Sequence, residues 1–103
     1  MDRIVKIKAM LEENPADSFL RHALALEYVK MGDDATARVV FEQLLTDNPA
    51  YVGSYYHLAK LLERAGDEAG AILVYEQGMA QAKAAGDQHA YNELRSAHEY
   101  LSF

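Results

Sequence analysis

Residues 14–47 read NPADSFLRHALALEYVKMGDDATARVVFEQLLTD, and residues 48–81 read NPAYVGSYYHLAKLLERAGDEAGAILVYEQGMAQ. Aligned at an offset of 34 residues, the two segments are identical at 12 of 34 positions. The identities include an opening Asn-Pro-Ala, the Leu-Ala pair that begins at Leu24 and Leu58, and the Gly-Asp pair that begins at Gly32 and Gly66. A fixed period of this length indicates a solenoid built from stacked supersecondary units.

The composition of the chain is that of a globular domain. Its 103 residues suit one domain, and half of them are apolar while a quarter are charged. The absence of cysteine excludes a disulfide framework and is consistent with a reducing compartment. No apolar run reaches the roughly 18 residues that a membrane span requires, and the first residues lack the apolar stretch of a signal peptide. We therefore expect a cytoplasmic protein that does not enter membranes.

The charge of the chain disfavours one class of partner. The formal net charge is −6, from 16 acidic and 10 basic residues. Proteins that bind nucleic acids normally present a basic face, whereas Lys6 and Lys8 form the densest basic pair here. We therefore expect no nucleic acid partner.

Apolar residues recur at helical spacing along the whole chain, and breakers separate the segments. Asn-Pro at residues 14–15 and 48–49 ends one helix in each copy, because a residue before proline avoids the helical conformation. Gly32 and Gly66 end another. Lys83 stands where a third proline would fall, so the fifth helix extends further. No segment alternates with a period of two, so we expect no sheet. The expected helices span residues 3–13, 18–31, 35–47, 52–65, 69–84 and 88–101.

The spacing of these residues resembles that of the tetratricopeptide repeat family, and of its small bacterial members in particular. The resemblance implies an all-α, right-handed α-α superhelix forming a single domain, with about two full repeats between an N-terminal half-repeat helix and a C-terminal capping helix. Its parts would be a half-repeat over 3–15, repeat one over 18–51, repeat two over 52–85 and the capping helix over 88–101. The matching residues are Leu24, Ala25, Tyr28, Ala37, Phe41 and Pro49 in repeat one, and Tyr55, Leu58, Ala59, Leu62, Ala71 and Tyr75 in repeat two.

Four positions depart from the family pattern. Arg21 occupies the large apolar position that Tyr55 fills in the second copy, and Leu44 and Gly78 stand where the family prefers alanine. Lys83 replaces the proline that closes a repeat. These departures bear on how tightly the helices pack and leave the fold unchanged.

The resemblance implies a scaffold that binds a peptide or a partner's helix in a concave groove, lined by the first helix of each repeat. Carried over by position, the groove residues are Phe19, His22, Leu26, Val29, Tyr56, Lys60, Glu63, His89, Asn92, Ser96 and Glu99. In the alternative, Leu26 and Val29 pack against a neighbouring helix and leave fewer exposed groups. A clamp for a partner's C-terminal carboxylate is not expected, because His22, Leu26 and His57 stand where it needs Lys, Asn and Asn.

Catalytic, metal and cofactor sites are not expected. The four histidines lack the converging three or four ligands that zinc requires, and the acidic pairs at residues 33–34 and 67–68 fall at helix starts, where the helix dipole favours carboxylates. No serine lies in a nucleophile elbow, and no glycine-rich phosphate loop occurs. We therefore expect a protein that is not an enzyme.

Self-association is the alternative function. Ile4, Ile7 and Leu11 on the opening half-repeat lack a complete partner pair, and Val5 adds apolar surface beside them. Terminal units of a solenoid normally carry a polar outer face. This departure predicts a homodimer through the first helix.

Overall fold

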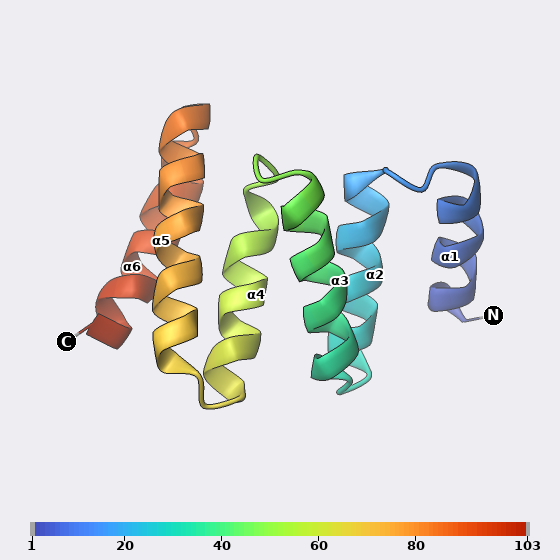
Figure 1. The fold of residues 1–103 in the computed structure, drawn as a ribbon, viewed down its shortest axis with the longest axis horizontal. Helices are drawn as coiled ribbons and strands as arrows, with labels where there is room; N and C mark the ends of the chain where they lie inside the picture. The colour runs from blue at the N-terminus through green and yellow to red at the C-terminus, as the bar shows by residue number, and fades with distance from the viewer. Residues whose placement is uncertain (1, 103) are drawn as a thin grey trace. The chain divides into compact units, whose positions relative to one another are not determined.

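The computed structural model describes residues 2–102, and this range forms α-helices with no strand (Figure 1). Each helix boundary lies within one residue of the expected one, so the predicted helices are confirmed. None of the helices in this range has the length and continuous apolar character of a membrane span. The helices are α1 (Arg3–Glu13), α2 (Ser18–Lys30), α3 (Asp34–Asp47), α4 (Gly53–Arg64), α5 (Glu68–Ala85) and α6 (Gln88–Ser102).

Aspartate side chains begin five of the six helices in this range. Each accepts a hydrogen bond from a backbone N–H of the first turn, which satisfies a donor that the helix itself leaves unpaired. The caps are Asp2 for α1, Asp17 for α2, Asp33 for α3, Asp67 for α5 and Asp87 for α6, with distances from 2.9 to 3.2 Å. Helix α4 differs, because Val52 precedes it and offers no side-chain cap.

Glycine ends α2, α4 and α5 in the left-handed region, where a side chain would be strained. Gly32, Gly66 and Gly86 have φ of 79°, 83° and 71°. After each of them the chain turns and the next helix begins two residues later, at Asp34, Glu68 and Gln88. Within each copy of the repeat, the second helix therefore returns beside the first.

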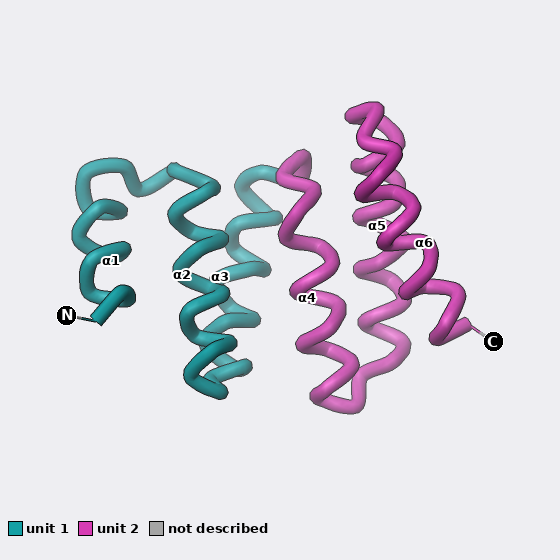
Figure 2. Tube along the Cα trace, turned by 180° about the vertical axis from the view of Figure 1, so that it is seen from behind, with its two compact units in different colours: residues 1–48 teal, residues 49–103 magenta. Residues whose placement is uncertain are grey.

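The described chain divides into two compact units, residues 1–48 and 49–103 (Figure 2). Unit 1 holds α1, α2 and α3, and unit 2 holds α4, α5 and α6. The division falls between Asn48 and Pro49, at the end of the first copy of the repeat.

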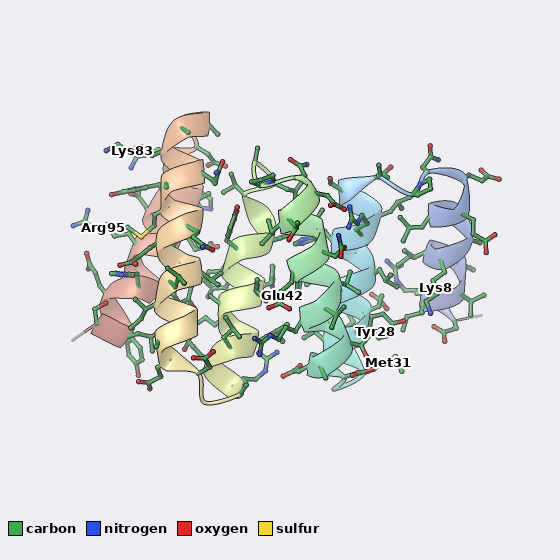
Figure 3. All side chains as sticks on the ribbon, in the orientation of Figure 1. Lys8, Tyr28, Met31, Glu42, Lys83 and Arg95 are labelled. Carbon is green, nitrogen blue, oxygen red and sulfur yellow. The ribbon has the colours of Figure 1, made fainter. Side chains whose placement is uncertain are left out.

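In unit 1, α1 packs on α2 through its isoleucines. Ile4 and Ile7 are buried with Leu24 in one apolar cluster, and Leu11 and Tyr28 border it. At the edge of this contact the Lys8 ammonium lies 5.8 Å from the centre of the Tyr28 ring (Figure 3). Further buried residues of this unit are Ala25, Ala37, Phe41 and Leu44.

In unit 2, α5 packs against both α4 and α6. The three helices approach one another closely at Gly78 of α5. A Cβ at position 78 would lie 2.6 Å from the Cβ of Tyr55 and 3.1 Å from Cδ1 of Leu94. Only glycine allows α4 and α6 to approach α5 this closely at that position. The buried residues are Ser54, Tyr55, Leu58, Ala59, Leu61, Leu62, Ala71, Tyr75, Gly78, Ala82 and Leu94.

Candidate peptide-binding surface

Helix α4 places three of the predicted groove residues in one connected cluster. Tyr56, Lys60 and Glu63 recur at helical spacing and therefore lie on one side of the helix. The Lys60 ammonium lies 5.4 Å from the centre of the Tyr56 ring and 3.4 Å from Oε2 of Glu63. We call these residues the α4 cluster.

Tyr75 of α5 packs against the α4 cluster and hydrogen-bonds to it. The Tyr75 ring is fully buried and lies 6.3 Å from the Tyr56 ring, between centroids. Its hydroxyl donates a hydrogen bond to Oε2 of Glu63. Burial and the neighbouring Glu63 carboxylate both raise the pKa of Tyr75. The hydroxyl therefore stays protonated and fixes the carboxylate that binds Lys60.

A cleft of about 640 Å³ lies beside this cluster, within unit 2. Tyr56 and Lys60 of α4 line one side of it, and four residues of α6 line the other. The α6 residues are Glu93, Ser96, Ala97 and Tyr100. Their spacing of three, one and three residues makes a single stripe along α6. Of the predicted groove residues, the structure brings Tyr56, Lys60 and Ser96 together around one open cavity.

His57 and Glu93 interact electrostatically beside the cleft. Partial burial lowers the pKa of His57, and the negative charge of Glu93 opposes that shift. The His57 ring also meets the Tyr56 ring edge to face, with 5.8 Å between their centroids. Glu93 is exposed and forms no ion pair within residues 2–102.

In unit 1 the predicted residues lie on α2. Phe19 is exposed over 69% of its surface. His22 is half-buried, and its ring meets the Phe41 ring edge to face at 5.6 Å between centroids. Leu26 and Val29 are half-buried. This face of α2 therefore offers one large exposed ring, beside aliphatic groups that expose only part of their surface.

The structure was compared with solved structures of other proteins. A tetratricopeptide repeat domain protein from Salinibacter ruber is 41% identical in a solution NMR structure, which covers 84% of this chain and 88% of that chain with a TM-score of 0.81. A crystal structure of a tetratricopeptide repeat domain protein from the same organism is 41% identical and covers 84% of this chain and 97% of that one, with a TM-score of 0.80. This chain belongs to the tetratricopeptide repeat family.

A solution structure from Bordetella parapertussis is also similar to this tetratricopeptide repeat chain. That protein is 28% identical, with coverage of 99% of this chain and 89% of that one and a TM-score of 0.84. No family model matches the sequence, and no curated protein matches it. Tetratricopeptide repeats mediate protein–protein interactions and are typically non-catalytic, so protein partners in general follow from the fold.

Two predicted groove residues of this tetratricopeptide repeat chain lie away from the cleft. His89 and Asn92 are exposed on the first turns of α6, and neither lines the cavity. Asn92 accepts a hydrogen bond of 2.8 Å from the Gln88 amide. Glu99 binds Arg95 in an ion pair of 2.8 Å. Of the four α6 residues that line the cleft, Ser96 is therefore the one that was also predicted as a groove residue.

The repeat pattern does not indicate Glu93, Ala97 and Tyr100 as cleft residues, and all three line the cleft. Helix α6 follows the repeat pattern at an offset of about two residues and has no Leu-Ala pair to set its register. One signal was available, because residues three and four positions from Ser96 share its side of the helix. That rule, applied to Ser96, gives Asn92, Glu93, Glu99 and Tyr100, so it includes two of the missed residues but does not separate them from Asn92 and Glu99.

No group of three or more metal-binding side chains occurs within residues 2–102. His98 illustrates the structural use of a histidine here, because its Nε2 lies 3.1 Å from Oε2 of Glu76 and links α6 to α5. No buried side-chain polar atom in the described range lacks a hydrogen-bond partner.

Proposed function

We propose that this chain is a non-catalytic scaffold that binds a peptide or helix of a partner protein along the first helices of its repeats. In unit 2 the surface comprises the α4 cluster and the cleft-lining stripe of α6, and in unit 1 the candidate residues are Phe19, His22 and Leu26 of α2. One observation carries the proposal, namely the open cleft in unit 2 where Tyr56, Lys60 and Tyr100 converge. In this proposal the two units form one continuous domain, and the protein acts in the cytoplasm.

The side chains at the cleft are better suited to binding a peptide than to catalysing a reaction. Tyrosine buries a large area at low cost in conformational entropy, and tyrosine anchors are frequent at binding surfaces. Tyr100 is exposed over 83% of its surface, so a partner that covers its ring would remove much apolar area from water. The extended cavity and its aromatic rims therefore support recognition of a side chain from a partner.

The proposal is tested with peptides selected from a randomised dodecapeptide library displayed on phage, with the full chain as bait. A selected peptide is synthesised with a fluorescent label, and its affinity is measured by fluorescence anisotropy. We expect Tyr100→Ala to weaken binding about tenfold or more, because truncation of an anchor ring typically costs more than 1 kcal/mol. The circular dichroism spectrum should not change, since the ring is exposed.

Leu73→Ala is the matched control. Leu73 lies on α5, is exposed and does not line the cleft. It should leave peptide affinity unchanged while removing a similar apolar surface. Equal affinities for the wild type, Tyr100→Ala and Tyr56→Ala would contradict binding in the cleft. The peptide affinity of Phe19→Ala, measured in the same way, tests whether α2 contributes to binding.

The alternative function, self-association through α1, has one supporting feature. An apolar cleft of about 360 Å³ lies in unit 1, and Leu11, Val39 and Val40 are among its lining residues. However, Ile4 and Ile7 are buried against α2, so α1 exposes only Val5 and Met10 as large apolar groups. Light scattering at micromolar concentration tests this alternative, and a monomer of 11.5 kDa would exclude it.

A further inference from the structure

The charges that line the unit 2 cleft do not balance. Lys60 is the one basic residue in the lining, and Glu63 lies 3.4 Å from its ammonium. Glu93 is the one acidic residue in the lining, and no basic side chain of residues 2–102 forms an ion pair with it. The charge left over at the cleft is therefore the negative charge of Glu93.

The aromatic rings of the cleft also favour a positively charged ligand. A ring face attracts cations through its quadrupole, and the attraction is worth about 0.5–1 kcal/mol at exposed sites. The Tyr56 ring already carries the Lys60 ammonium at 5.4 Å. The Tyr100 ring, on the opposite wall, is mostly exposed. It therefore offers a ring surface to a ligand.

The cavity is large enough for a long side chain. Its volume of about 640 Å³ equals that of about 20 water molecules, at roughly 30 Å³ for each molecule in the liquid. Ser96 and Ala97 are small, so the α6 wall is low between Glu93 and Tyr100. Glu93 and Tyr100 lie seven residues apart, about 10 Å along the axis of α6, so a long side chain that lies along this wall is needed to span the distance between the ring and the carboxylate. The net charge of −6 on the whole chain also attracts cations at long range.

We propose that the cleft selects partner segments with a basic side chain, arginine above lysine, which pairs with Glu93 and lies against Tyr100. The inference rests on the proposed peptide-binding function and names the partner's chemistry. Arginine is favoured because its planar guanidinium binds a carboxylate through two hydrogen bonds, while its long aliphatic stem lies along the low wall toward Tyr100. An acidic partner segment is disfavoured, because Glu63 already neutralises Lys60, the only base in the lining.

The test uses the phage-selected dodecapeptides. We expect arginine or lysine to be enriched at one position among the peptides that the full chain selects. In the synthesised peptide, replacing that arginine with citrulline, its neutral isostere, should weaken binding about fivefold, the effect of a partly exposed ion pair. Glu93→Gln should weaken binding of the arginine peptide by a similar factor. With Glu93→Gln, arginine and citrulline peptides should bind almost equally, because the pair is already broken.

Glu12→Gln is the matched control, because it removes the same charge from an exposed position in unit 1. It should leave the preference for arginine over citrulline unchanged. Loss of the preference in Glu12→Gln would assign it to net charge and overturn the inference. Glu93 is exposed, so Glu93→Gln should fold, and the citrulline peptide tests the same pair without any change to the protein.

The outcomes separate this inference from the proposed function. Peptides that depend on Tyr100 but show no basic enrichment, or that bind Glu93→Gln as well as the wild type, would overturn the inference and leave the peptide-binding function standing. If no selected peptide depends on Tyr56 or Tyr100, both proposals are overturned.

Discussion

The two copies of the repeat build the same helical hairpin, yet they differ at pairs of positions that contact each other in the second copy. In the first copy, buried Phe41 is aligned with Tyr75 of the second, and Val29 is aligned with Glu63. The second copy thus gains a hydroxyl in its core and, on the neighbouring helix, the carboxylate that accepts its proton. The first copy has neither group. A buried hydroxyl needs such a partner, which explains why the two substitutions occur together.

A second pair exchanges large and small residues. Leu44 in the first copy is fully buried, and its counterpart is Gly78. Arg21 in the first copy corresponds to Tyr55 in the second. Tyr55 occupies the space beside Gly78, whereas Arg21 extends to Asp47 in an ion pair of 2.9 Å. The departures from the family pattern therefore compensate each other within each copy.

The same backbone hairpin therefore carries a different surface in each of the two copies. In the second copy, the hydroxyl of Tyr75 holds Glu63, which in turn holds Lys60 against the Tyr56 ring. In the first copy the corresponding side of α2 carries Leu26 and Val29. The polar cluster belongs to the second copy, and the cleft beside it is lined by this copy and by α6.

The largest expected effect comes from giving the second copy the large residue of the first. In Gly78→Leu the new Cβ would lie 2.6 Å from the Cβ of Tyr55, so α4 and α5 must separate. We expect the free energy of unfolding to fall by about 1–3 kcal/mol, the usual cost of overpacking. Urea denaturation followed by circular dichroism measures the change.

Gly53→Ala is the control for the glycine substitution. No atom lies within 4 Å of a Cβ at position 53, and the residue begins α4. Alanine should leave the stability unchanged or raise it by up to about 1 kcal/mol, through its higher helix propensity. A stable Gly78→Leu variant would show that the contact between α4 and α5 is not tight.

Exchanging the residues of the Tyr75–Glu63 pair between the copies should have a smaller effect. Tyr75→Phe removes the hydrogen bond to Glu63 and should destabilise the protein by about 1.5 kcal/mol, typical of a bond to a charged group. Phe41→Tyr should cost about as much, because the aligned acceptor is Val29. Adding Val29→Glu to Phe41→Tyr should recover part of the loss, as measured in a double-mutant cycle. Full additivity of the two substitutions would contradict the proposed coupling.

The loss of folding stability at alkaline pH tests the Tyr75–Glu63 pair as well. It is the smallest of the expected effects. The pKa of Tyr75 is raised in the folded protein, whereas an unfolded tyrosine titrates near pH 10. Below about pH 10 the hydroxyl is protonated in both states, so its contribution is fully present. Above that pH only the unfolded state loses the proton, and stability falls by up to about 1.4 kcal/mol per pH unit for this group.

Urea midpoints at pH 8, 10 and 11 measure this dependence. Tyr75→Phe should show a shallower loss of stability above pH 10 than the wild type. The buried Tyr55, whose pKa burial also raises, contributes to the loss in both proteins and therefore cancels in the comparison. Identical pH profiles would show that the hydroxyl of Tyr75 does not resist ionisation.

The sequence was sufficient for the helices because their ends carry specific chemistry. Proline, glycine at positive φ and capping aspartates act locally, so the helix boundaries were predicted to within one residue. Helix α4 shows that backbone carbonyls can replace such a cap. It lacks a side-chain cap, and the N–H groups of Ser54 and Tyr55 instead donate to the carbonyls of Tyr51 and Val52, each at 3.3 Å.

The candidate site was predicted less completely, because it depends on the rotation of α6. The positions on α4 follow from the repeat, and of the groove residues predicted there Tyr56 and Lys60 line the cleft. The rotation of α6 is set by Leu94 against Gly78 and by His98 against Glu76. These are tertiary contacts without a repeat equivalent to reveal them, so Glu93 and Tyr100 were missed.

The central proposal is that a partner peptide occupies the cleft between α4 and α6 in unit 2. The most direct measurement is a titration of the ¹⁵N-labelled full chain with a selected dodecapeptide, followed by amide chemical shifts. Binding in the cleft should give the largest shifts at Tyr56, Lys60 and Ser96, and small shifts around Leu73 on α5. Saturable shifts centred on Leu73, with none at the cleft residues, would contradict it.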